Sequence, residues 1–178
     1  MNHRPVRASA RIKLFARWSH LIGGVGLVLA LCVPTLARAN EAVDCAAGSG
    51  TLLIGHAVSA PVFKHGQFKK GVELSHTHVR LMDSAGRSYD VAIDNVFATG
   101  YVKNMKTVPA PLNAIASGDR LEACGAPFPG GIHWVHTNCG NVPTPQSPNG
   151  WIKKIQPDGS ASVNFEGGQT YCSLWPRH

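Results

Sequence analysis

Four cysteines constrain the fold of this chain more than any other feature of its 178 residues. They are Cys45, Cys124, Cys139 and Cys172, and they lie beyond a segment that has the character of an export signal. An even number of cysteines in a short exported domain predicts a disulfide framework. Of the three possible pairings, we expect Cys45–Cys172, which ties the two ends together, and Cys124–Cys139, which closes a hairpin. A zinc–thiolate site is the rival interpretation, although the sequence contains no C-x-x-C pair.

Residues 1–39 have the features of a secretory signal peptide. Basic residues fill the start, an apolar run of 13 residues extends from Leu21 to Val33, and Ala37-Arg38-Ala39 supplies a small-x-small cleavage pattern. We therefore expect cleavage before Asn40 and a protein that is periplasmic or secreted. At a rise of about 1.5 Å per residue the run spans about 20 Å, short of the roughly 30 Å hydrocarbon core. An uncleaved membrane anchor and a lipoprotein signal at Cys32 are the alternatives.

The excess of positive charge lies in the predicted signal. The chain carries 17 basic and 10 acidic residues, and six of the basic residues but none of the acidic ones precede residue 40. Residues 40–178 therefore hold 11 basic and 10 acidic side chains. A domain so close to neutrality predicts no nucleic acid partner. After cleavage we expect no stable membrane anchor, and the sequence identifies no protein partner.

Beyond residue 40 the chain consists of short extended segments separated by turns. Polar and apolar residues alternate along Arg87–Ile93, which follows Leu74–Met82 across the turn Asp83–Gly86, so these segments predict a hairpin. Further strands are predicted at 51–62, 120–124, 131–137, 151–155 and 162–165, and a short helical turn at 112–116. The pattern predicts one exported all-β domain over residues 40–178, stapled by disulfides and with few short helical turns. We expect a small antiparallel barrel of the oligonucleotide/oligosaccharide-binding (OB) type or a sandwich.

Two pairs of histidines carry the functional prediction. The first pair, His76 and His78, lies on a predicted strand, where residues two apart share one face about 6.5–7 Å apart along the backbone. Neutral imidazole is a common ligand of zinc and copper, and this spacing suits two ligands of one ion. Hydrogen-bonded histidines at the mouth of a barrel, without a metal, are the alternative interpretation.

The second pair, His133 and His136, follows Gly130-Gly131. Residues three apart in a regular strand face opposite ways, so both imidazoles reach one site only across a bulge or a helical turn. We expect one of the two to join the first pair, which leaves an open coordination position as in catalytic zinc sites.

Carboxylates and other histidines complete the inventory of polar candidates. Asp90 and Asp94 are candidates for a fourth ligand or for groups that orient the imidazoles. His56 reads as a core histidine, His65 as a solvated loop residue and His178 as part of a frayed end.

Aromatic residues offer a different kind of site. Trp134 and Trp151, with Trp175, can form a platform on which sugar rings or bases stack, or they can fill the core of a small barrel. The sequence contains none of the G-x-S-x-G, H-E-x-x-H, P-loop or dinucleotide-binding patterns.

The segments GGIHWVH (130–136) and GWI (150–152) resemble a family of short exported bacterial proteins of unknown function. In that family Gly-Gly precedes an Ile-His-Trp-x-His segment and Gly-Trp-Ile follows. His76 and Gly118-Asp119 match further features, and the similarity covers roughly residues 74–155. The resemblance implies export and a compact β domain, and it implies no activity.

Three functions are consistent with these residues. The first is a soluble exported protein that binds a divalent transition metal, zinc before others, for capture or handling. The second is a metal- or histidine-dependent hydrolase of phosphoesters or envelope polymers, in which a histidine acts as general base. The third is a saccharide- or protein-binding module that uses Trp134 and Trp151. Convergence of the imidazoles on one point favours the first two over the third.

Overall fold

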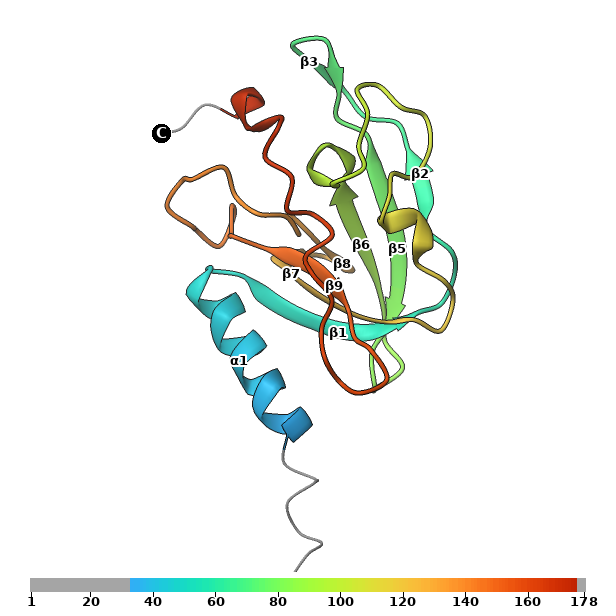
Figure 1. Ribbon diagram of the computed structural model, residues 1–178, viewed down its shortest axis with the longest axis vertical. Coiled ribbons are helices and arrows are strands. Elements are labelled where there is room, and N and C mark those ends of the chain that lie inside the picture. Colours follow the sequence, from blue (N-terminus) through green and yellow to red (C-terminus); the bar gives the residue numbers. More distant parts are fainter. Residues whose placement is uncertain (1–32, 176–178) are drawn as a thin grey trace, which may run out of the picture. The chain divides into compact units, whose positions relative to one another are not determined.

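The computed structural model describes residues 33–175 (Figure 1). Its elements in chain order are α1 (Val33–Ala47), β1 (Thr51–Ala57), β2 (Val62–Lys64), β3 (Phe68–Lys69), β4 (Val72–Glu73), β5 (His76–Met82), β6 (Ser88–Asp94), η1 (Asn95–Phe97), η2 (Leu112–Ala114), β7 (Arg120–Phe128), β8 (Gly131–His133), β9 (Trp151–Lys154) and η3 (Cys172–Leu174). Most of the predicted signal, Cys32 and His178 lie outside the described residues, and α1 crosses the predicted cleavage point.

Five strands close into a barrel. Strand β1 pairs antiparallel with β5 and with β7, β5 pairs antiparallel with β6, and β7 with β8. The remaining pair, β6 with β8, is parallel. Numbered in chain order, the barrel strands therefore follow one another as first, second, third, fifth and fourth, and the fourth returns to the first. This order is that of an OB-type barrel, so the predicted all-β barrel is confirmed, with β6–β8 as a parallel exception.

The predicted hairpin is confirmed as β5 and β6, and its alternation separates core from surface. Val79 and Leu81 of β5 and Val91 and Ile93 of β6 are buried in the main core cluster. Their neighbours in sequence point outward, because successive side chains of a strand leave opposite faces of the sheet. The outer face of this hairpin therefore carries most of its polar residues, whereas Thr77 is buried on the inner face and donates to Asn95 Oδ1.

Four strand predictions need correction, one of them being 131–137, which is a strand only over Gly131–His133. The segment 51–62 divides into β1 and β2, because the strand is interrupted before Pro61. Strand β2 then pairs with the first half of β5, on the edge where β1 pairs with its second half. Strand β7 continues to Phe128, so the turn before β8 is shorter than predicted. The segment 162–165 runs beside β9 without forming a strand, held by the bonds Ser162 N to Lys154 O and Phe165 N to Ile152 O.

The close contact between β6 and β8 depends on a glycine. A Cβ atom at Gly131 would lie 2.2 Å from the Asp90 carbonyl oxygen and 2.4 Å from the Phe128 ring. Only a residue without a side chain lets β8 approach β6 closely enough to form the parallel pair that closes the barrel.

Two disulfides form, but the predicted pairing is wrong. The bonds are Cys45–Cys124 and Cys139–Cys172. Cys124 pairs in register with Leu52 of β1, just after α1, which brings it beside Cys45. The expected hairpin forms as β7 and β8, but Cys124 lies beyond its paired residues and is opposite Leu52 of β1 and Trp151 of β9, so it does not meet Cys139. Two disulfides indicate an oxidising, non-cytoplasmic environment.

Helix α1 lies against the barrel beside Trp151. Lys153 of β9 donates to Glu41 over 2.6 Å, and its Nζ lies 3.8 Å from the buried Glu122 carboxylate. Cys45 anchors the last turn of the helix through its disulfide. Over residues 33–175, no helix has the length and apolar character needed to cross a bilayer.

Candidate functional site

The outer face of β5 and β6 brings imidazoles and carboxylates together. His76 lies directly opposite Asp94 in the β5–β6 register, and His78 lies opposite Ala92, diagonal to Asp90. Residues opposite each other in an antiparallel pair share a face. The ring centroids of His76 and His78 are 6.3 Å apart, which confirms that the two histidines lie on one face.

Each histidine of β5 contacts a carboxylate of β6. His76 Nε2 lies 2.7 Å from Asp94 Oδ1, and His78 Nδ1 lies 2.8 Å from Asp90 Oδ2. The hydrogen bond to Asp94 raises the pKa of His76 above its usual value, against the opposing effect of partial burial. Burial also opposes ionisation of Asp94, but the His76 hydrogen bond and the nearby imidazoles lower the pKa of this carboxyl overall. Asp94 is therefore a carboxylate at neutral pH.

These residues open onto a cavity of about 580 Å³. Its lining combines four groups able to bind a metal with apolar and aromatic walls: Leu74, His76, His78, Ala92, Asp94, Phe128, His133, Trp134 and Trp175. A volume of this size accommodates a small organic ligand. Strands 2 and 3 of an OB barrel, here β5 and β6, form the face that binds ligands in that fold.

An unusual backbone conformation at Trp134 separates His133 from His136. Strand β8 ends at His133, and Trp134 adopts φ 57°, a left-handed value that bulky residues rarely take. The chain turns there, so His133 remains exposed beside the first cavity while His136 is directed inward. Such conformations concentrate at functional sites, where the surrounding structure compensates the strain.

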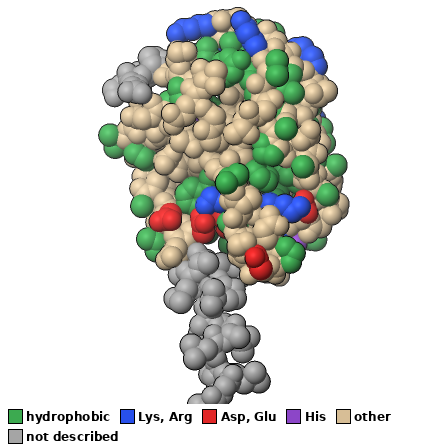
Figure 2. Space-filling model, in the orientation of Figure 1, with side chains coloured by type: hydrophobic (Ala, Val, Ile, Leu, Met, Phe, Trp, Pro, Cys, Tyr) green, Lys and Arg blue, Asp and Glu red, His purple; other side chains and the backbone are tan. Residues whose placement is uncertain are grey.

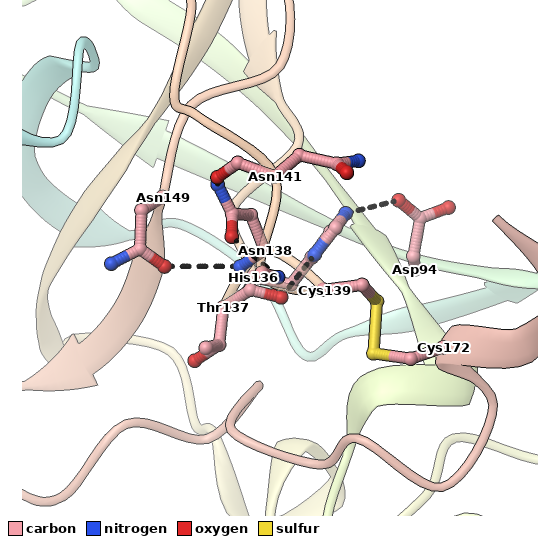
Figure 3. Close-up of a disulfide and its surroundings, with 9 residues drawn as sticks. Asp94, His136, Thr137, Asn138, Cys139, Asn141, Asn149 and Cys172 are labelled. Atoms are coloured by element: carbon pink, nitrogen blue, oxygen red, sulfur yellow. Dashed lines mark hydrogen bonds and ion pairs between the residues drawn. A yellow bond between two sulfur atoms is a disulfide. The ribbon is translucent and has the colours of Figure 1, made fainter. Parts of the chain in front are cut away.

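His136 is the most constrained imidazole of the site (Figure 3). The residue is 2% exposed, and its ring stacks on Phe97 with centroids 3.7 Å apart. Its Nδ1 lies 3.0 Å from the Thr137 carbonyl oxygen, and its Nε2 lies 3.5 Å from Asp94 Oδ2. Burial lowers the pKa of His136 below its usual value, against the charge of Asp94.

No neutral form of His136 satisfies both of its ring nitrogens. With the proton on Nδ1, the ring donates to Thr137 and turns the Nε2 lone pair toward the Asp94 carboxylate. With the proton on Nε2, the Nδ1 lone pair faces a carbonyl oxygen instead. Within residues 33–175, Nε2 has no hydrogen-bond partner. The short distance to Thr137 favours the first form, which leaves a buried nitrogen lone pair aimed at an anionic oxygen.

A second cavity, of about 330 Å³, lies on the other side of Trp134 and Trp175, which line both cavities. His136, Phe97 and Asn138 contribute to its walls, and the Cys139–Cys172 disulfide borders it. The local sequence pattern does not predict this cavity, because nothing in it brings Trp175 to residues 97 and 134.

A buried carboxyl group lies near Asp94 and was not predicted from the sequence either. Glu166 is completely buried, and neither carboxyl oxygen has a hydrogen-bond partner among the described residues. Burial, followed by the charge of Asp94, raises the pKa of Glu166 well above its usual value. Its buried position therefore favours the protonated form of this carboxyl.

The predicted metal ligands converge in part. His76, His78 and His133 line one cavity with Asp94, while His136 reaches the same carboxylate from the other side. Both members of the second pair thus lie around Asp94, where one was expected. Within the described range, no three His, Cys, Asp or Glu side chains form a group already arranged to hold a metal ion.

Two other residues differ from the sequence predictions. Trp151 is buried beside the Cys45–Cys124 disulfide, with Lys153 Nζ 4.6 Å from its ring centroid, so it offers no stacking surface. His56 is exposed rather than part of the core, because its side chain leaves the outer face of β1. Trp175, rather than Trp151, shares the cavity walls with Trp134.

Comparisons with protein-family models, curated proteins and solved structures find no match for this chain.

Proposed function

We propose that Asp94, His76 and His136 bind a divalent transition metal, zinc before others, with His133 on the open side of the site. The observation that supports this most is the buried His136 Nε2, which has no hydrogen-bond partner within residues 33–175 and faces a carboxylate oxygen 3.5 Å away. A cation between that nitrogen and Asp94 satisfies both groups, and Nδ1 keeps its bond to Thr137. Metal-binding histidines commonly donate their other N–H to a backbone carbonyl in this way.

The two separations around Asp94 can be compared with those of a zinc site. Zinc bonds of about 2.0–2.2 Å in a tetrahedron place ligand atoms about 3.3–3.5 Å apart. His136 Nε2 and Asp94 Oδ2 already have that separation. His76 Nε2, at 2.7 Å from Asp94 Oδ1, has to withdraw by less than about 1 Å. Two imidazoles and a carboxylate suit zinc, and they leave a fourth position for His133 or water.

The two disulfides support a role in metal capture or handling outside the cytoplasm. We propose that residues 1–39 direct export and that the domain acts in the periplasm or beyond the cell. His78 is held by Asp90 at the rim, and the proposal does not require it as a ligand.

A histidine-dependent hydrolase is the second candidate. The observation in its favour is the His76–Asp94 pair, which opens into the cavity of about 580 Å³ between aromatic walls. In this reading Asp94 orients the imidazole, and His76 accepts a proton from water as general base. Hydrolysis of an ester substrate that survives a chelator and is lost in His76→Ala favours this candidate over the first.

Calorimetric titration of the purified exported protein with zinc tests the metal proposal. We expect one site per chain, and at least about a tenfold loss of affinity in Asp94→Asn and in His136→Gln, since each removes one metal bond. His56→Gln is the matched control, because His56 is exposed on β1, outside the site, and should leave affinity unchanged. Absence of heat at micromolar zinc, or equal affinity in all three variants, contradicts the proposal.

A further inference from the structure

We propose that the β3–β4 hairpin and the loop beside it dock reversibly on an anionic membrane surface. The surface consists of Phe68, Lys69, Lys70, Val102, Lys103 and Lys106, called the hairpin patch below. Phe68 and Val102 are 63% and 68% exposed. Basic side chains, drawn in blue, lie at the end of the protein that carries β3 (Figure 2). This inference does not depend on the proposed metal site.

The lysines of the patch surround one short hairpin. Lys106 Nζ lies 5.8 Å from the centroid of the Phe68 ring, and Lys70 Nζ donates to the Ser173 carbonyl over 3.2 Å. Lys103 Nζ would lie 4.0 Å from a Cβ atom at Gly71, the glycine of the turn. Lys69 Nζ lies 5.2 Å from the Trp175 ring centroid. Four ammonium groups are thus concentrated around residues 68–71.

The carboxylate that contacts this patch is already engaged. Glu73 is buried, and it binds Lys106, His65 Nδ1 and the Gly66 backbone N–H. Within residues 33–175, the ion pairs of the other acidic residues are with side chains outside the patch. Because Glu73 balances the charge of Lys106, the patch carries the net positive charge of Lys69, Lys70 and Lys103.

A tight turn and hydrogen bonds from a neighbouring loop fix the shape of the hairpin. Lys70 and Gly71, the two residues between β3 and β4, have φ of 50° and 74°, as a type I′ turn requires. Asparagine or glycine is favoured at the first of these positions, so a lysine there carries a conformational cost. Asn104 braces the hairpin from the neighbouring loop, accepting from Glu73 N over 2.8 Å and donating to Gly71 O over 3.3 Å.

An exposed aromatic ring among ammonium groups fits a lipid interface. Aromatic and aliphatic tips enter the headgroup region, while lysines are attracted to anionic lipid. A soluble polyanion would engage the lysines but offers no apolar layer for Phe68 and Val102. The combination therefore favours a bilayer over an acidic polymer.

Co-sedimentation with lipid vesicles tests the inference. The exported protein is mixed with vesicles of phosphatidylcholine alone or of equal parts phosphatidylcholine and phosphatidylglycerol. We expect binding to the anionic vesicles, weakened by salt, and little binding to the neutral ones. Lys70→Asn should lower the partition constant about fivefold, because each lysine near an anionic surface contributes about that factor.

Lys70→Asn is informative because asparagine suits the turn, so the hairpin keeps its shape while the charge is lost. Phe68→Ser tests the apolar contribution and should also weaken binding. Val163→Ser is the matched control, since Val163 is 81% exposed but lies outside the patch, and it should bind as the parent does. Thermal unfolding midpoints close to that of the parent verify that each variant is folded.

Two results overturn the inference. One is equal binding to neutral and anionic vesicles. The other is unchanged vesicle binding in Lys70→Asn and Phe68→Ser. Capture by soluble polyglutamate that Phe68→Ser leaves intact, without vesicle binding, assigns the patch to an acidic polymer instead.

Discussion

At the scale of single residues, His136 combines good packing with poor hydrogen bonding. Its ring stacks on Phe97, yet its Nε2 is buried next to a carboxylate without a hydrogen bond among the described residues. An unsatisfied buried polar atom costs about 1–3 kcal/mol. Natural proteins accept such a cost where the group has a task, which is why this atom carries the functional proposal.

The stability of His136→Phe tests that interpretation. Phenylalanine keeps the stacking and removes the unsatisfied nitrogen, but it also loses the bond to the Thr137 carbonyl. These effects oppose each other, so we expect the metal-free variant to unfold at nearly the temperature of the parent. Zinc at about 100 times its dissociation constant should stabilise the parent by about 2.7 kcal/mol and leave the variant unchanged. Thermal unfolding with and without zinc measures both effects. A variant stabilised by zinc to the same extent as the parent contradicts the assignment.

Gly131 carries the second prediction at this scale. A methyl group there would overlap the Asp90 carbonyl oxygen, so Gly131→Ala should lower the free energy of unfolding by about 1–3 kcal/mol. Gly167→Ala is the control, since its Cβ would meet its nearest neighbour at 3.8 Å and should cost little. Urea unfolding compares the two variants. Equal stabilities would show that β8 can move away from β6 without cost.

At the scale of elements, Glu73 connects β4 to the loop that contains Lys106. Bonds from Lys106 and then His65 lower the pKa of Glu73 from 4.5 to about 2. A carboxyl with a lowered folded-state pKa stabilises the fold above its unfolded-state value, and that stability is lost as the pH falls. The parent should therefore lose more stability between about pH 4.5 and 2 than Glu73→Gln does. Urea unfolding across this range measures the difference, and parallel pH profiles for the two proteins would contradict it.

The elements also show what sequence pattern can and cannot predict. The period of a strand places His76 and His78 on one face, and turn residues mark the β5–β6 hairpin, so both were predictable. The approach of His136 to Asp94 was not, because it depends on Trp134 in a left-handed conformation that its residue type disfavours. Trp175 reaches the cavities through long-range packing, which no local pattern encodes.

At the scale of the whole molecule, disulfide pairing follows from strand order. An even cysteine count predicted two bonds, but only the β1–β7 closure determines that Cys45 meets Cys124. The positions of the cysteines along the chain had instead suggested Cys45–Cys172 and Cys124–Cys139. The all-β barrel class was predictable from the pattern of strands and turns. The cysteine partners were not, because they depend on contacts between segments that are distant in the sequence.

Removing either disulfide should destabilise the protein by a similar amount. The bonds close segments with sequence separations of 79 and 33 residues. Loop-closure entropy predicts losses of about 4 kcal/mol each, with the longer loop costing less than about 1 kcal/mol more. Paired cysteine-to-serine variants measured by urea unfolding check this prediction. A much larger loss for Cys139→Ser with Cys172→Ser would mean that the loops around the second cavity unfold with that bond.

The bond between Cys139 and Cys172 also has a consequence for the cavities. It holds the segment that ends in Trp175, three residues further on, against the walls that enclose the histidines. Without that bond, no covalent link fixes the Trp175 wall beside His76 and His136. The complete enclosure therefore requires oxidised thiols, so the shape of both cavities is tied to the redox state of the surroundings.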